Sequence, residues 1–268
     1  MKNRIALVGG GRMGGAMLRG WADLADTMDF VVFEPTPSAE IAKLIEQHAW
    51  TLNPDPKGLA PFDCVVLGIK PQHFTIVCDQ IVHDLVDEQT IMVSIMAGIG
   101  TSKIAEMTHV QHVIRAMPNT PGQIGKGITA YWCVPNVPFR GQALAIKLLS
   151  PLGRVEKLQH EEQLDAVTAV SGSGPAYVFL LAEAMAAAGE AEGLERGLAE
   201  RLAWQTVIGA GALLAQSGQS PQALRRAVTS PEGTTAAATE VLTEGGGIFT
   251  LVRRAIEAAV LRSRQIGK

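Results

Sequence analysis

The chain has 268 residues, of which 47% are hydrophobic and 18% charged, and its formal net charge is −3. This composition is typical of a globular protein of one large or two ordinary domains, and it argues against nucleic acid or a membrane as the partner. No apolar stretch approaches the length of a membrane span, and the first strand begins by about Asn3, too early for a signal peptide, so we expect a cytoplasmic protein. Neither the six histidines nor Cys64, Cys78 and Cys133 have metal-ligand spacing, so we expect buried thiols and no metal site.

The chain opens with a glycine-rich turn between a predicted strand and a predicted helix. The apolar residues 5–8 lead into Gly9-x-Gly11-x-x-Gly14, and helix formers continue to Leu24. In a doubly wound sheet such a turn presents backbone N–H groups and the positive end of the helix dipole to a dinucleotide pyrophosphate. Gly9 allows the tight turn, Gly11 lets the phosphate approach the backbone, and Gly14 lets the helix pack on the strand. The same pattern also occurs without a ligand, so its context must support it.

An acidic residue supplies part of that context. Glu34 ends the second predicted strand, 30–33, about 20 residues past Gly14, where an acid that binds the ribose is expected. Its carboxylate would accept from a 2′-hydroxyl and repel a 2′-phosphate, which favours NADH. Thr36 and Ser38 could bind a phosphate if Glu34 turned aside, so the choice between NADH and NADPH stays open.

Three later loops follow predicted strands, at the edge of the sheet where ligands bind. Lys70 would meet a phosphate or ribose, although an ordinary turn lysine fits equally well. The small residues of 94–98 leave room for a flat ring. Asn119 lies between two prolines, where its carboxamide could bind a nicotinamide or substrate group, or only complete an Asx-type turn. The residues expected to bind the cofactor are Gly9, Gly11, Arg12, Met13, Gly14, Glu34, Ile69, Lys70, Pro71, Ala97, Gly98 and Asn119.

Strands and helices alternate up to about residue 160, which predicts a parallel sheet covered on both faces, with the last two strands antiparallel at an edge. The predicted strands are 5–8, 30–33, 64–69, 91–95, 113–116, 128–132 and 154–157, and the predicted helices are 13–24, 39–47, 72–86, 102–107 and 138–150. We therefore expect an α/β fold in which residues 1–160 form a Rossmann-type dinucleotide-binding domain.

The strand signal disappears in the second half, where the predicted helices are 175–188, 195–216, 221–228, 234–242 and 247–266. The first two are apolar nearly all round, so they must be buried on more than one side. About a hundred residues cannot bury them alone. We expect residues 161–268 to form an all-helical dimerisation domain that packs against a second copy. The alternative is that these helices only cover the first domain.

Two Ser/Gly segments precede helices of this half, 171–177 with Pro175 in the first helical turn, and 229–235. Each predicted helix N-terminus offers free N–H groups and hydroxyls, which suit a small carboxylate. One such segment could be only a well-capped helix. We interpret the pair as a substrate cradle.

Together these segments resemble the delta-1-pyrroline-5-carboxylate reductases. The resemblance is carried by residues 9–14, 70–71, 94–98, 115–121, 165–177, 230–235 and 262–263, of which 165–177 and 230–235 are specific to that family. It implies hydride transfer from NADPH or NADH to the C=N carbon of a cyclic imine, giving L-proline, in a homodimer of domain-swapped helices that is often part of a ring of dimers. It also implies that the substrate carboxylate binds the backbone of Ser230, Gly233 and Thr234, that Thr235 donates its hydroxyl toward the ring nitrogen, and that Ser171 and Ser173 line the opposing wall.

The residues of the candidate loops agree with an imine reductase. A carbonyl reductase needs an acid for the developing alkoxide, and no His or Tyr/Lys pair occurs there. A cyclic imine is basic enough to arrive protonated, so catalysis would be chiefly positional, with Thr235 assisting. One departure is Glu232, which stands where the family commonly has Gly.

Two other functions fit part of the sequence. A β-hydroxyacid dehydrogenase would need a lysine on a long helix of the second half, yet Lys157 and Lys268 are the only lysines after Lys147. A non-catalytic dinucleotide sensor would have no use for a paired substrate cradle.

Overall fold

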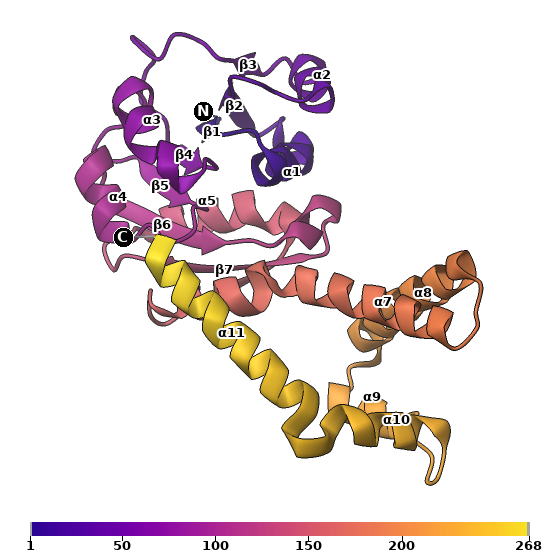
Figure 1. Ribbon diagram of the computed structural model, residues 1–268. Coiled ribbons are helices and arrows are strands. Elements are labelled where there is room, and N and C mark those ends of the chain that lie inside the picture. Colours follow the sequence, from indigo (N-terminus) through magenta and orange to yellow (C-terminus); the bar gives the residue numbers. More distant parts are fainter. Residues whose placement is uncertain (1, 267–268) are drawn as a thin grey trace. The chain divides into compact units, whose positions relative to one another are not determined.

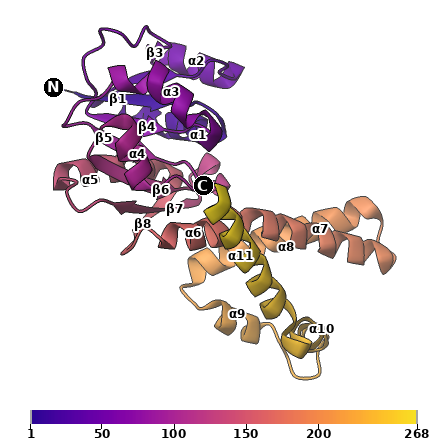
Figure 2. The ribbon, with the colours of Figure 1, turned by 60° about the vertical axis from the view of Figure 1, so that its left-hand side comes forward.

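The structure is a computed structural model that describes residues 2–266, and its chain forms two compact units. One unit comprises residues 2–173 together with 259–266, and the other comprises residues 174–258. Figures 1 and 2 show strands and helices in the first unit and helices alone in the second. The division into domains at residues 160 and 161 stays a prediction.

The first unit is built on an eight-stranded sheet in the order β3-β2-β1-β4-β5-β6-β7-β8. Strands β1 to β6 are parallel, β7 is antiparallel to β6, and β8 is parallel to β7. The chain starts at β1 in the middle of the sheet, adds β2 and β3 on one side, and then crosses over to add β4 and the later strands on the other side. The position between β1 and β4, where the order of the strands reverses, is the switch point of a doubly wound fold. The strands are Asn3–Val8 (β1), Met28–Phe33 (β2), Thr51–Leu52 (β3), Cys64–Leu67 (β4), Ile91–Ser94 (β5), His112–Met117 (β6), Gly127–Cys133 (β7) and Gly153–Lys157 (β8).

Helices cover both faces of this sheet, as predicted for strands that are apolar on both sides. Along β1, Ile5 and Leu7 join one buried cluster with residues of α1, α2 and α5, while Ala6 and Val8 join the opposite cluster with residues of α3 and α4. The helices are Arg12–Trp21 (α1), Ala39–Gln47 (α2), Phe74–Gln80 (α3), Thr101–Thr108 (α4) and Phe139–Leu149 (α5). The three cysteines are free and buried, as expected, and burial raises the pKa of Cys78 to about 12.

Two local predictions for this unit were wrong. The short strand β3 was missed, because a strand of two residues is too short to show an alternation of apolar and polar side chains. The helix expected over 72–86 is interrupted at Ile81, whose φ of −134° lies outside the helical region, so α3 is followed by a separate 3-10 turn at Val82–Asp84.

The second unit is helical throughout its described length. Its helices are Gly174–Ala191 (α7), Arg196–Ser217 (α8), Pro221–Ala227 (α9), Thr234–Thr243 (α10) and the first part of Gly247–Ile266 (α11). Helices α7 and α8 pack side by side (Figure 1), and the residues they bury are alanines: Ala182, Ala186, Ala199 and Ala203. The large side chains of both helices stay exposed.

Helix α6, Gln163–Val167, leads directly into a π-helical turn at Thr168–Gly172, and only Ser173 separates this turn from α7. This run, Gln163–Ala191, is 29 residues long with a mean hydropathy of 1.3, so by length and composition it could cross a membrane. The expectation that no apolar stretch has this length was therefore wrong, because the helix begins twelve residues before Pro175. Core helices of soluble proteins pass the same test, so this finding alone assigns no membrane.

Candidate dinucleotide and substrate sites

The glycine-rich turn has the geometry of a phosphate cradle. Gly9 follows β1 with φ +104°, a region that favours glycine. A Cβ on Gly14 would collide with the carbonyl oxygen of Gly9, so α1 can pack this closely against the turn only because residue 14 has no side chain. Gly11 is the N-cap of α1, without a side-chain cap, and nothing lies within 4 Å of where its Cβ would be. The residues therefore fit a pyrophosphate, which could approach the open backbone in front of α1.

The other residues expected to bind the cofactor lie along the same edge of the sheet. They follow the carboxyl ends of five adjacent parallel strands: Gly9, Gly11, Arg12, Met13 and Gly14 after β1, Glu34 after β2, Ile69, Lys70 and Pro71 after β4, Ala97 and Gly98 after β5, and Asn119 after β6. Ligands bind at this edge in open α/β sheets. The fold thus brings these residues together, while their contacts with a cofactor stay predictions.

Two hollows meet at Glu34. The larger, with a volume of about 660 Å³, lies between the ends of β1 and β2 and helix α3, and Ile69, Lys70 and Ile76 contribute to its wall. The smaller, about 390 Å³, lies between α1 and α2 and includes Arg12. Gly11, Glu34 and Thr36 line both.

The carboxamide of Asn119 is bonded within the protein. Its Oδ1 accepts from the backbone N–H of Ile128 at 3.0 Å, and its Nδ2 donates to Oγ of Ser171 at 3.2 Å. Asn119 thus ties the loop after β6 to the π-helical turn. Its role toward a nicotinamide or a substrate stays a prediction.

Helix α7 starts at Gly174 with Pro175 in its first turn, as expected, but the π-helical turn Thr168–Gly172 precedes it where a Ser/Gly loop was expected. Ser171 and Ser173 lie inside the helical run, and the N–H of Ser173 donates to the carbonyl of Thr168 at 2.8 Å, five residues back. A wide turn of this kind accommodates Pro175, which has no N–H to donate. The two serines therefore offer hydroxyls, but not the free N–H groups of a helix start.

In the second unit, the segment 229–235 does end at a helix N-terminus. Gly233 is the N-cap of α10 and has no side-chain cap, and the first backbone bond of the helix runs from the N–H of Ala237 to Gly233 at 3.2 Å. The N–H groups of Thr234 and Thr235 therefore lie ahead of the helical hydrogen bonds. A side chain at residue 233 would collide with the hydroxyl of Ser230.

Glu232 adopts φ +59°, the left-handed region in which glycine is favoured. Glutamate in place of glycine at this position therefore both adds a negative charge and puts a residue with a side chain into a backbone conformation that favours glycine. The Glu232 side chain is exposed.

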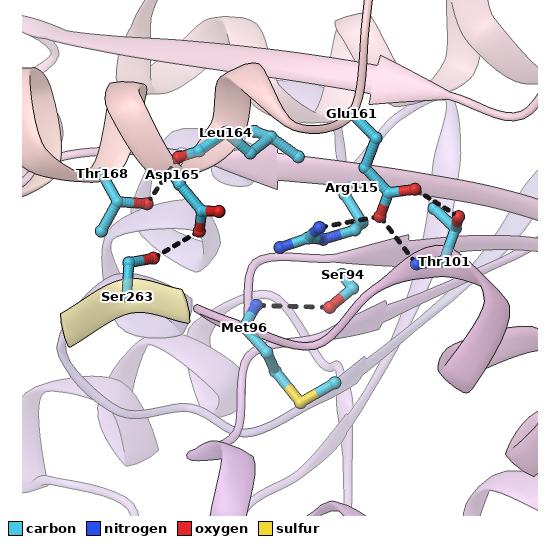
Figure 3. A network of polar contacts seen from close by, with 9 residues as sticks. All are labelled: Ser94, Met96, Thr101, Arg115, Glu161, Leu164, Asp165, Thr168 and Ser263. Carbon is cyan, nitrogen blue, oxygen red and sulfur yellow. Dashed lines mark hydrogen bonds and ion pairs between the residues drawn. The ribbon is translucent and has the colours of Figure 1, made fainter. Parts of the chain in front are cut away.

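A polar network near the end of β6 was missed by the sequence analysis (Figure 3). The carboxylate of Glu161 accepts from Nη1 of Arg115 at 2.7 Å, and from the N–H and hydroxyl of Thr101 at 2.8 and 2.7 Å. Burial by itself raises the pKa of Glu161, but these hydrogen bonds and the charge of Arg115 together hold it below its ordinary value. The only signal in the sequence was an arginine inside an otherwise apolar strand, which needs a partner when buried.

A separate set of polar contacts joins the C-terminal part of α11 to α6. Asp165 accepts from the hydroxyl of Ser263 at 2.7 Å and pairs with Arg264 at 3.5 Å (Figure 3 shows the first of these bonds). The pairing accounts for the end of α11 belonging to the first unit.

A doubly wound sheet with a glycine-rich turn after β1, an acid after β2 and an all-helical second part is the architecture of an NAD(P)H-dependent oxidoreductase. Residues 4–98 match the family model described as NADP oxidoreductase coenzyme F420-dependent, and residues 161–266 match that of pyrroline-5-carboxylate reductase dimerisation.

Relatives match over the whole chain. A Pseudomonas aeruginosa pyrroline-5-carboxylate reductase is 38% identical over 99% of this chain and 97% of its own, and one from Synechocystis is 35% identical over the full length of both. The solved reductase of Coxiella burnetii superposes with a TM-score of 0.88 at 32% identity, covering both chains fully. The Plasmodium falciparum enzyme, solved with NADP bound, gives 0.81 at 28% identity and covers 99% of this chain and 98% of its own. This chain belongs to the pyrroline-5-carboxylate reductase family.

Proposed function

We propose that this chain transfers a hydride from NADPH or NADH to the C=N carbon of 1-pyrroline-5-carboxylate, giving L-proline in the last step of proline biosynthesis. The observation that carries the proposal is the uncapped N-terminus of α10, preceded by Ser230 and a tight turn, in a chain whose relatives carry this name over their full length. A small carboxylate fits this helix end, since the dipole there is worth about 0.3–1 kcal/mol to an anion, and up to ~2 kcal/mol when partly buried.

The roles of the substrate residues follow from their chemistry. The backbone around Ser230, Gly233 and Thr234 would hold the carboxylate, with the N–H of Thr234 as the donor least committed to the turn, because that of Gly233 already donates to Ser230 at 3.1 Å. Thr235, one residue further along the helix, would donate its hydroxyl toward the ring nitrogen. Ser171 and Ser173 would line the opposing wall.

The bound nicotinamide supplies the hydride. What the chain supplies is orientation: the glycine cradle holds the pyrophosphate, and the α10 N-terminus holds the ring through its carboxylate. Because the imine arrives protonated, Thr235 needs only to direct the ring nitrogen and not to transfer a full proton.

The proposal is tested by incubating the protein with pyrroline-5-carboxylate and following the absorbance of NADH and NADPH at equal concentrations. Thr235→Ala is expected to lower kcat and leave the Kd of the cofactor nearly unchanged. Thr243→Ala, at the other end of α10, is the matched control and should retain wild-type turnover. Absence of oxidation of either cofactor would refute the reductase function, and wild-type turnover in Thr235→Ala would remove that residue from the mechanism.

We also propose a cytoplasmic homodimer, which in a larger assembly would form a ring of dimers. Helices α7 and α8 expose large apolar side chains, including Phe179 at 63%, Trp204 at 54% and Ile208 at 62%. They lie in the region that matches the dimerisation model, residues 161–266. A second copy, rather than a membrane, would cover the apolar helix 163–191.

Light scattering coupled to size exclusion tests this assembly. The expected mass is at least twice the 28.4 kDa of the chain. Ile208→Glu on the exposed face of α8 should shift the distribution toward monomer, whereas Glu46→Gln on α2 should not. A wild-type protein that elutes only as monomer would contradict the dimer.

A further inference from the structure

We infer that Glu34 makes this chain select NADH over NADPH. The inference deepens the proposed function and rests on its dinucleotide site. It concerns the group on the adenosine ribose that distinguishes the two cofactors, a 2′-hydroxyl in NADH and a 2′-phosphate in NADPH.

The carboxylate of Glu34 is held in place by backbone donors. Its Oε2 accepts from the N–H of Gly10 at 2.7 Å, and its Oε1 accepts from the N–H of Thr36 at 3.0 Å. The backbone of Glu34 is bonded on both sides to the carboxamide of Asn53, at 2.8 Å each. The acid thus stands at the carboxyl end of β2 in a defined orientation.

The side chain also lies flat against the glycine-rich turn. A Cβ on Gly10 would come within 3.1 Å of both Cβ and Cγ of Glu34, so the two residues are already close. Turning Glu34 aside would break its bonds to Gly10 and Thr36. Oε2 accepts only the bond from Gly10, so it still has an unused acceptor position that a ribose hydroxyl can occupy.

Both hydroxyls that could bind a phosphate already make one contact within the protein. The hydroxyl of Thr36 points to Oε1 of Glu34 at 3.4 Å, next to the bond from its own N–H. The hydroxyl of Ser38 caps α2 by accepting from the N–H of Ile41 at 3.3 Å. A phosphate held by Thr36 and Ser38, the alternative left open by the sequence, would therefore require the Thr36 hydroxyl to give up its contact with Glu34, although the Ser38 hydroxyl could still donate its own hydrogen.

The charges around the smaller hollow also disfavour a phosphate. Its wall includes two carboxylates, Glu34 and Glu40, and two arginines, Arg12 and Arg19. Arg19 pairs with Glu40 at 3.2 Å, so of the two arginines in this hollow only Arg12 has no ion pair within residues 2–266. A 2′-phosphate would thus meet one uncommitted cation and the fixed charge of Glu34, and like charges at contact distance repel.

Equilibrium binding of NADH and NADPH, followed by calorimetry on the full-length protein, tests the inference without relying on turnover. The wild type should bind NADH at least about fivefold more tightly, since a unit charge about 4 Å from a like charge costs about 1 kcal/mol even in high dielectric. Glu34→Gln keeps the size of the side chain and removes its charge, and Glu34→Ser opens the site. Both should reduce the preference at least several-fold, chiefly by tightening NADPH binding.

Glu46→Gln is the matched control, because it removes one carboxylate from the exposed face of α2, outside both hollows. Its ratio of dissociation constants should equal that of the wild type. Equal affinities, or tighter NADPH binding, in the wild type would overturn the inference, as would an NADH preference that survives in both Glu34 variants. Failure of the folded wild type to bind either cofactor would instead overturn the proposed function itself.

Discussion

Replacing Glu161 by alanine should strongly destabilise the first unit. The change deletes three hydrogen bonds of 2.7 to 2.8 Å and leaves the guanidinium of Arg115, whose side chain is only 9% exposed, without its ion-pair partner. Nε of Arg115 already has no hydrogen-bond partner in the described chain, so the loss of Glu161 adds to the unpaired part of a buried guanidinium.

The magnitude follows from the burial of the pair. Removing one partner of a buried ion pair costs about 3–5 kcal/mol. The Glu161 side chain is 21% exposed, and water can then reach part of the site, so the lower end applies, about 3 kcal/mol. At roughly 2–4 °C per kcal/mol for chains of 150–250 residues, the melting temperature should fall by about 6–12 °C.

The pH dependence of stability adds an independent check. Because the folded-state pKa of Glu161 lies below its ordinary value of 4.5, its contribution is present above pH 4.5 and is lost as the pH falls through the lower folded-state pKa. The difference in stability between wild type and Glu161→Ala should therefore shrink in acid.

Urea unfolding followed by circular dichroism at pH 7 and at pH 3 measures both effects. Glu156→Ala on β8 removes the same charge from an exposed position and should stay within about 0.5 kcal/mol of the wild type. Replacing both partners, Arg115→Met with Glu161→Leu, should cost less than Glu161→Ala alone, since no buried charge is left over. If Glu161→Ala unfolds like the Glu156→Ala control, the network does not stabilise the fold as argued.

Three further predictions concern the glycine-rich turn, Glu232 and Trp21. Gly11→Ala should unfold like the wild type, since a Cβ there meets nothing within 4 Å, yet calorimetry should show weakened NADH binding. Gly14→Ala should lose stability as well, because its Cβ would collide with the carbonyl oxygen of Gly9. Equal NADH affinity in wild type and Gly11→Ala would refute the binding of the pyrophosphate at the glycine-rich turn. Glu232→Gly should be more stable than Glu232→Ala by about 1 kcal/mol in urea unfolding, because only glycine adopts φ +59° without strain, and equal stabilities would contradict this. Trp21→Phe should cost about 1–3 kcal/mol in thermal unfolding, because it strips a buried 2.8 Å hydrogen bond from the carbonyl of Leu148; an unchanged melting temperature would show that this carbonyl finds another donor.

The local elements were largely readable from the sequence. Buried strands such as Cys64–Leu67 and the long helices of the second unit agree with the predicted ranges within a few residues, because hydrophobic periodicity is a local property of the chain. The glycine spacing at residues 9–14 likewise reports a local backbone requirement. The segment 171–177 was misread for the converse reason: serine and glycine are typical of loops, and the π-helical turn that absorbs them has no sequence signature.

The sequence by itself therefore determined the doubly wound sheet, the switch to an all-helical half and the sets of residues gathered at the carboxyl edge. Tertiary structure alone decided how the polar side chains are partnered. Glu161 meets Arg115 across 46 residues, Asn119 meets Ser171 across 52, and Glu34 meets Gly10 across 24. Such pairings depend on which strand ends and turns the fold brings within hydrogen-bonding distance, and no periodicity along the chain encodes that distance.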